Sequence, residues 1–266
     1  MNGDPKSAAE FQQARSAGGA ELRFRLAGAG PPYLQGALQN PAFGEEHLAP
    51  ILSNPALPPG LIQQISGNRQ WLARYEVQRG VVFHRNSPRA LKQNLIHFLL
   101  WKDLVRAAED PLMPPPLRRT AETILKARIE EMALGEKIAL ARIAGPGVIP
   151  SLRSDPHPDV VTALLGNPRL PEEEVLALCA EERVIPAVLS AVGCHAKWRS
   201  RHPVRRELLR NPLTPATVSL GFLDSLSAAD LAEIASLPKI PRLVRATAKQ
   251  ILGSRHDLVD RRGAVS

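Results

Sequence analysis

Short apolar stretches of helical length recur along most of the chain, and each is followed by a break that contains proline. The breaks read Asn-Pro or Ser/Thr-Pro and lie in ALQNPAF, ILSNPALPPGLI, FHRNSPRAL, ALLGNPRLPEEEVLAL and LLRNPLTPATV. The residue before a proline is pushed out of the α region, and a second proline a few residues later suits the first turn of the next helix. The pattern therefore predicts many short helices joined by tight corners.

Composition restricts the fold further. Hydrophobic residues make up 44% of the 266 residues but aromatic residues only 4%, so the core must consist mainly of Leu, Ala, Val and Ile, which suit closely stacked helices. The 25 prolines lie between the apolar stretches, where helices are expected to begin and end. We expect an all-α fold, an α-solenoid (α-α superhelix) of short helix-pair repeats.

The sequence also contains an internal duplication. Residues 71–128 align without a gap with residues 198–255, 127 positions later, and 17 of the 58 aligned pairs are identical, among them Trp71 and Trp198. Composition alone would give about 4 or 5 identities. Upstream, SNPALP (53–58) matches GNPRLP (166–171) 113 positions later. The change of spacing predicts extra residues in the second copy, folded as an additional helix around 184–192.

Four regions follow from this pattern. Residues 1–30 lack apolar periodicity and are expected to be a flexible N-terminal tail. The first helical half is expected over 31–145 and the second over 146–255, divided at Gly145-Pro146-Gly147, which breaks a helix. A flexible C-terminal tail is expected over 256–266.

Three stretches carry a resemblance to a known family: SDPHPDVVTALLGNPRLPEEEVLALCA (154–180), WLARYEVQRGVVFHRNSPRAL (71–91) and WRSRHPVRRELLRNPLTPATV (198–218). They resemble units of the leucine-rich-repeat-variant family, a relative in style of the HEAT-like α-solenoids. The resemblance covers 40–220 in patches, rests on the Asn-Pro corners, and does not extend to 92–150. It implies a curved superhelix of alternating short helices and no reaction. Family members with an iron–sulfur cluster hold it in a cysteine-rich segment that this chain lacks, so the resemblance implies no cofactor or metal.

Positive charge is concentrated toward the C-terminus. The net charge is +8, and residues 197–262 hold 13 Lys and Arg against 6 Asp and Glu. We therefore expect the second copy alone to be strongly basic. Such a segment can bind nucleic acid, an anionic membrane surface or an acidic protein. A solvated basic surface is the alternative, and it is favoured because no aromatic stacking platform or nucleic-acid motif accompanies the charge.

The candidate partner-binding residues are a tryptophan at a helix start and the basic residues around the duplicated segment. In a solenoid, one helix of each pair lines the concave surface, where repeated arginines would bind carboxylates or phosphates. The alternative is that the tryptophans pack between repeats, and that the arginines cap helices or pair with Asp103 and Asp230. The candidates are Arg74, Arg79, Lys197, Trp198, Arg201, Arg205, Arg206, Arg242 and Arg245.

No catalytic or metal-binding motif is found. Gly-x-Ser-x-Gly, Ser-x-x-Lys and Walker sequences are absent. Cys179 and Cys194, with His195 and His202, lack the Cys-x-x-Cys spacing of a zinc site. The three glutamates after Pro171 suit the first turn of a helix.

The chain shows no signal peptide, no disulfide framework and no apolar run long enough to span a membrane. It is therefore expected to be cytoplasmic, and our leading hypothesis is a repeat protein of bacterial type. We expect a non-enzymatic scaffold that binds a protein on the concave face of the solenoid, with no cofactor; an acidic partner would suit its charge. The alternative is a nucleic-acid-binding solenoid that contacts the phosphate backbone through its basic C-terminal repeats. An enzyme with a dispersed site is a third, more remote hypothesis.

Overall fold

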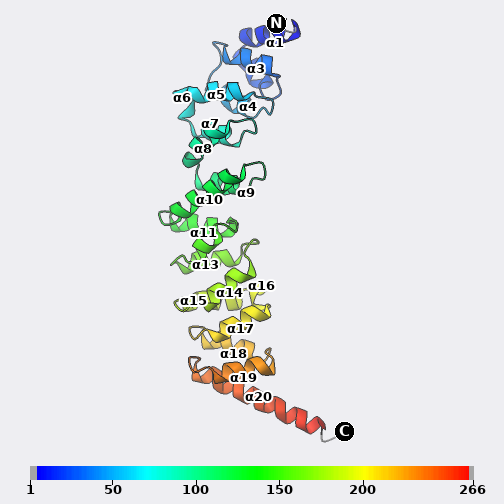
Figure 1. Ribbon diagram of the computed structural model, residues 1–266, viewed down its shortest axis with the longest axis vertical. Helices are drawn as coiled ribbons and strands as arrows, with labels where there is room; N and C mark the ends of the chain where they lie inside the picture. Colours follow the sequence, from blue (N-terminus) through cyan, green and yellow to red (C-terminus); the bar gives the residue numbers. More distant parts are fainter. Residues whose placement is uncertain (1–4, 264–266) are drawn as a thin grey trace. The chain divides into compact units, whose positions relative to one another are not determined.

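The computed structural model describes residues 5–263, with side chains as far as Arg255. Within that range the chain is helical and contains no strand (Figure 1), which confirms the expected all-α class. The chain divides into two compact units, Met1–Arg128 and Ile129–Ser266, called unit 1 and unit 2 below.

Unit 1 consists of short helices that follow one another with brief corners between them. Helix α5 begins with proline shortly after the Asn54-Pro55 corner, as the Asn-Pro pattern predicts, and α3 also begins with proline. Helix α1 packs against α3, α4 against α7, and α7 against α8. The bounds are α1 (Pro5–Ser16), α2 (Gly19–Arg25), α3 (Pro31–Leu38), η1 (Glu45–His47), α4 (Leu48–Leu52), α5 (Pro59–Gly67), α6 (Arg69–Leu72), α7 (Tyr75–Phe83), α8 (Arg89–Leu95), η2 (Ile96–Phe98), α9 (Trp101–Glu109) and α10 (Pro115–Ile129).

Unit 2 has the same construction. Helix α11 packs against α13, α14 against α17, and α19 against α20. The three glutamates after Pro171 form the first turn of α14, where their negative charge is favourable. The bounds are α11 (Leu134–Ile143), α12 (Ile149–Arg153), α13 (Pro158–Leu165), α14 (Glu172–Ala180), α15 (Pro186–Cys194), α16 (Ala196–Arg199), α17 (His202–Arg210), α18 (Ala216–Leu223), α19 (Ala228–Ser236) and α20 (Arg242–Gly263).

The helices of unit 2 repeat those of unit 1 at a constant separation of 127 positions. Helices α3, α5, α6, α7 and α9 have the same first and last positions as α13, α15, α16, α17 and α19 after this shift. The helix expected around 184–192 is therefore present as α15, but it is the counterpart of α5 and not an addition. The second copy carries no extra residues before Trp198, so the proposed change of spacing was wrong.

The asparagine of each Asn-Pro corner explains how successive helix pairs are joined. Asn40 is buried. Its side-chain amide donates hydrogen bonds to the carbonyl oxygens of Ala14 and Ala17, both at 2.8 Å. Its Oδ1 accepts the N–H of Ala42 at 2.7 Å and thereby closes the turn. One side chain thus forms its own corner and holds the end of an earlier helix.

Asn167 in unit 2 makes the same bonds 127 positions later. Its amide donates to the carbonyl oxygens of Ala141 at 2.8 Å and Ala144 at 2.9 Å, and its Oδ1 accepts the N–H of Arg169. The corner at Asn167 therefore corresponds to the corner at Asn40, not to the one at Asn54 that the SNPALP match suggested.

The expected flexible tail over 1–30 is instead helical from Pro5. Ala14, Leu22 and Leu26 are fully buried, and α1 packs against α3. The contact depends on Gly36, because a Cβ at that position would lie 2.2 Å from the carbonyl oxygen of Phe11. Small residues allow this close approach, and they give little of the apolar periodicity by which helices are recognised in a sequence.

The division between the two units falls after Arg128 and not at Gly145-Pro146-Gly147. Helix α11 precedes that break but belongs with unit 2, because Asn167 holds its last residues. At the C-terminus, α20 continues through most of the expected tail, as far as Gly263. Residues 264–266 lie outside the described residues.

Candidate functional site

The charge distribution differs from the expectation that only the second copy is strongly basic. Residues 71–128 hold 11 Lys and Arg against 5 Asp and Glu, and residues 198–255 hold 10 against 4. Between the copies, residues 129–196 hold 5 against 10. The two copies are therefore equally basic, and charge alone does not single out the second one as the binding surface.

Two of the candidate arginines lie in equivalent clusters around a buried or half-buried aspartate. In unit 1, Arg79 on α7 donates from Nε to Oδ1 of Asp103 on α9 at 2.9 Å, and this hydrogen bond raises the pKa of Arg79. Tyr75 also donates its hydroxyl to Asp103. Burial and the Asp103 carboxylate raise the pKa of Tyr75 to about 12. The cluster fastens α7 to α9.

The cluster of unit 2 replaces the tyrosine with a histidine. Asp230 on α19 lies 3.4 Å from Nε of Arg206 and 3.2 Å from Nε2 of His202, both on α17. A hydrogen bond from Ser227 lowers the pKa of Asp230 most, and the hydrogen bond with His202 and the charge of Arg206 lower it further. Arg206 also pairs with Glu233 at 3.0 Å.

A second pair of candidate arginines is likewise engaged within its own unit. Arg74 forms an ion pair with Glu45, and Arg201 lies 3.7 Å from Glu172 at the equivalent positions of unit 2. Arg74, Arg79, Arg201 and Arg206 are therefore structural ion-pair partners. The alternative in which the arginines pair with Asp103 and Asp230 is confirmed for Arg79 and Arg206. Arg74 and Arg201 pair with glutamates instead.

Trp198 is part of the core of unit 2. It is 1% exposed, and its Nε1 donates to the carbonyl oxygen of Leu165 at 2.9 Å. Nζ of Lys197 lies 4.0 Å from the centroid of the Trp198 ring, a cation–π distance. Trp198 is therefore not available to a partner in the way that a binding-groove assignment requires, and the packing interpretation holds for it. Lys197 is exposed and stays a candidate.

The remaining candidates do not converge on one pocket. Arg242 is exposed at the start of α20, while Arg205 and Arg245 are half-buried. Nε of Arg205 and of Arg245 is buried without a hydrogen-bond partner in the described part of the chain. These three arginines carry no ion pair to any described residue, but they do not line the unit 2 pocket described next.

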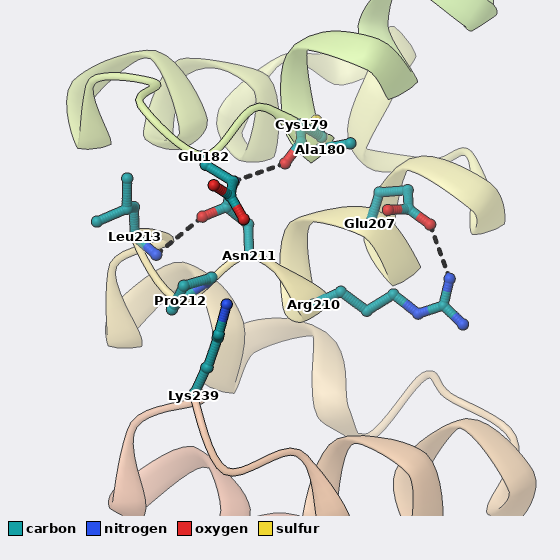
Figure 2. A pocket seen from close by; sticks show the side chains of 9 residues that line it. All are labelled: Cys179, Ala180, Glu182, Glu207, Arg210, Asn211, Pro212, Leu213 and Lys239. Atoms are coloured by element: carbon teal, nitrogen blue, oxygen red, sulfur yellow. Dashed lines mark hydrogen bonds and ion pairs between the residues drawn. The ribbon is translucent and has the colours of Figure 1, made fainter.

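That pocket, called the Lys239 pocket, lies between the ends of α14 and α17 and the corner before α20. It has a volume of about 420 Å³, within the range of small-ligand sites. Figure 2 shows Lys239 reaching into it from below and Glu182 facing it from the other side. The lining residues are Cys179, Ala180, Glu182, Glu207, Arg210, Asn211, Pro212, Leu213 and Lys239.

Most polar groups of the Lys239 pocket are already paired. Asn211 donates to the carbonyl oxygens of Cys179 at 2.7 Å and Glu181 at 3.1 Å. Arg210 pairs with Glu207 at 2.9 Å (Figure 2) and also with Glu233. Lys239 differs from Arg210, since its ammonium group makes no hydrogen bond or ion pair with a described residue.

The only thiol in the pocket is poorly suited to nucleophilic chemistry. Burial raises the pKa of Cys179 to about 12, so the thiol stays protonated at neutral pH, whereas the thiolate is the reactive form. In the described residues, no three His, Cys, Asp or Glu side chains gather so that they could hold a metal ion. Among the described helices, none has both the length and the hydropathy that crossing a membrane requires.

Sequence reasoning missed this pocket. In the sequence, Lys239 is one of several basic residues of 197–262 and nothing distinguishes it. The residues that line the pocket come from three segments that are brought together only by folding. The one local signal was the Asn211-Pro212 corner. Comparisons with protein-family models, with curated proteins and with solved structures find no match to this chain.

Proposed function

We propose that this chain is a binding protein whose helix pairs form an α-solenoid of the HEAT-like or leucine-rich-repeat-variant kind. Within each unit, corner asparagines such as Asn40 and Asn167 join a helix pair to an earlier one by the same two hydrogen bonds. A bond pattern that recurs from pair to pair supports a repeat architecture, in which each unit contacts mainly its neighbours.

The function proposed is the binding of an acidic segment of a partner protein in the Lys239 pocket. The main support is the ammonium group of Lys239, which reaches into the pocket (Figure 2) without an ion pair to any described residue. A carboxylate from a partner would complete it. Pro212 and Leu213 border the same pocket and offer apolar contact to the residues beside that carboxylate.

The pocket suits one carboxylate better than a polyanion. Glu182 faces Lys239 across it (Figure 2), and a second negative group would be repelled there. A surface that binds nucleic acid would instead require several unpaired cations arranged along the phosphate backbone of the nucleic acid. Four of the arginines expected for that role are occupied by Glu45, Asp103, Glu172, Asp230 and Glu233.

Fluorescence anisotropy with labelled, end-capped peptides tests the proposal. The peptides carry one Glu among apolar residues, and a Gln replaces that Glu in the matched peptide set. We expect the Glu peptides to bind and the Gln peptides to bind at least tenfold more weakly. Lys239→Gln should abolish this difference, whereas Lys249→Gln, an exposed lysine of α20, should preserve it.

A second experiment measures the binding of generic duplex DNA and single-stranded RNA to the chain at about 50 mM salt, because non-specific electrostatic binding is strong at low salt. Nucleic-acid binding in the absence of peptide binding would overturn the proposal in favour of a phosphate-binding protein. Glu peptides that bind Lys239→Gln as tightly as the original chain would overturn the assignment of the pocket.

A further inference from the structure

Unit 1 contains a buried lysine that the proposed function does not use. Lys92 lies on α8 and is only 6% exposed. It lines a pocket of about 430 Å³ together with Phe83, Arg85, Asp110, Leu112 and Met113, called the Lys92 pocket below. The Lys92 ammonium group makes no hydrogen bond or ion pair with any residue that the structure describes.

An unpaired ammonium group in this position is costly. Lysine is rarely buried unless it is paired, and moving a charge out of water is repaid only by a close counter-ion and hydrogen bonds. Burial lowers the pKa of Lys92, and the more distant Asp110 carboxylate offsets this effect only in part. A buried lysine whose ammonium group has no partner among the described residues points to an anion bound in the pocket that it lines.

Asp110 lines the same pocket but forms no ion pair with Lys92, and its carboxylate has another role in the fold. Its Oδ1 accepts the N–H of Leu112 at 2.8 Å, which is the turn-closing bond that Asn40 makes with Ala42. A carboxylate lacks the amide donor with which Asn40 holds an earlier helix end. Asp110 therefore cannot donate the side-chain hydrogen bonds by which Asn40 joins its corner to an earlier helix. The Lys92 pocket lies beside this corner.

The Lys92 pocket and the Lys239 pocket occupy equivalent places in the two units. Phe83, Arg85 and Leu112 of the first lie 127 positions before Arg210, Pro212 and Lys239 of the second. In unit 2 a serine, Ser219, replaces Lys92, and in unit 1 a leucine replaces Lys239. Each pocket thus has one unpaired lysine, supplied by a different element.

We propose that the Lys92 pocket binds the carboxylate of a small organic acid that has a short apolar tail. The Lys92 ammonium pairs with the carboxylate, and the exposed guanidinium of Arg85 is a second donor at the rim. Phe83, Leu112 and Met113 contact the tail. The pocket volume is of the size that encloses a ligand of this class. The site uses none of the residues of the Lys239 pocket, so it stands independently of the proposed function.

Calorimetric titration of the full chain with sodium hexanoate tests this site. With Lys239→Gln present in every variant to remove the other carboxylate site, we expect one hexanoate per chain, with affinity at least tenfold lower in Lys92→Met and unchanged in Lys126→Met, a matched change at an exposed lysine of α10. Hexanoate should bind about tenfold more tightly than butyrate, because two further methylene groups are buried. Neutral 1-hexanol should bind at least tenfold more weakly than hexanoate.

The Arg85→Gln variant keeps the test decisive if Lys92→Met does not fold. Arg85 is exposed, so its replacement should leave folding intact and weaken hexanoate by about threefold, as expected for a rim charge pair of modest strength. Three results would overturn the proposal: no heat of hexanoate binding, equal affinity for hexanoate in folded Lys92→Met, or inorganic phosphate binding as tightly as hexanoate. If Lys92→Met does not fold, equal affinity for hexanoate in Arg85→Gln would also overturn the proposal.

Discussion

Asn40 and Asn167 make the same pair of buried hydrogen bonds, each to the carbonyl oxygens of alanines that lie 26 and 23 residues earlier in the chain. An asparagine before proline is often explained by the turn that it closes. Here the same side chain also satisfies two carbonyl groups at the end of a helix, which otherwise lack partners. The corner motif is therefore a tertiary contact as well as a local one.

Replacing this asparagine should destabilise unit 1 far more than replacing an exposed one. Asn40→Ala leaves the carbonyl oxygens of Ala14 and Ala17 buried without their donor, and we expect a loss of about 2 to 3 kcal/mol. Asn94→Ala, at an exposed position of α8, should change stability by less than about 0.5 kcal/mol. Urea denaturation followed by circular dichroism compares the two, and equal losses would contradict the tethering role.

The helices and corners could be predicted from the sequence because their signals are local. A proline and the residue before it restrict the backbone wherever they occur. The duplication was found from Trp71 onward, where identities are frequent. Upstream it was misaligned, since SNPALP is more like GNPRLP than QNPAFG is, although Asn40 is the true counterpart of Asn167. The hydrogen bonds to Ala14 and Ala141 show that Asn40 and Asn167 are equivalent, and these bonds cannot be seen in a comparison of the sequences.

The candidate site was harder to predict for a different reason. The duplicated arginines were correctly linked to Asp103 and Asp230 as one alternative, because all four positions are preserved between the copies. The pockets depend on which charges remain unpaired after folding. Lys92 and Lys239 are unremarkable in the sequence, and only the three-dimensional arrangement shows that neither has a counter-ion among the described residues.

The close contact of α1 with α3 leads to a second prediction, which concerns the stability of variants at Gly36. Gly36→Ala would place a Cβ 2.2 Å from the carbonyl oxygen of Phe11, and backbone atoms cannot move aside cheaply. We expect a loss of about 1 to 3 kcal/mol from this overpacking. Gly60→Ala on α5 meets nothing within 4 Å, so it should be neutral or stabilise by up to about 1 kcal/mol. Thermal denaturation of both variants checks the opposite signs.

Trp198 and Trp71 should respond differently to the same substitution. Trp198→Phe removes the donor to the buried carbonyl oxygen of Leu165 and leaves a small cavity, so we expect a loss of about 2 kcal/mol or more. Trp71 is half-buried and contacts Phe43, with ring centroids 5.5 Å apart. Trp71→Phe should therefore cost less. A larger effect at Trp71 would contradict the assignment of Trp198 to the core.

The carboxylates between α17 and α19 should make unit 2 sensitive to acid. Ser227, His202 and Arg206 lower the pKa of Asp230, and Arg210 followed by Arg206 lowers the pKa of Glu233. A pKa that is lower in the folded than in the unfolded chain means that the folded chain binds fewer protons. The resulting stability is present above the unfolded pKa values of about 4 and is lost as the pH falls through the folded values.

The urea midpoint of the intact chain should therefore fall between about pH 6 and pH 3, and the fall should be smaller in Glu233→Gln, whose side chain does not titrate. The variant should be less stable than the original chain at pH 6, where the ion pairs with Arg206 and Arg210 are intact, and closer to it at pH 3. Glu130→Gln, at an exposed position, should retain the full pH dependence. If Glu233→Gln retains the full dependence as well, its ion pairs with the two arginines contribute nothing to the acid sensitivity, and Asp230 alone accounts for the contribution of this cluster.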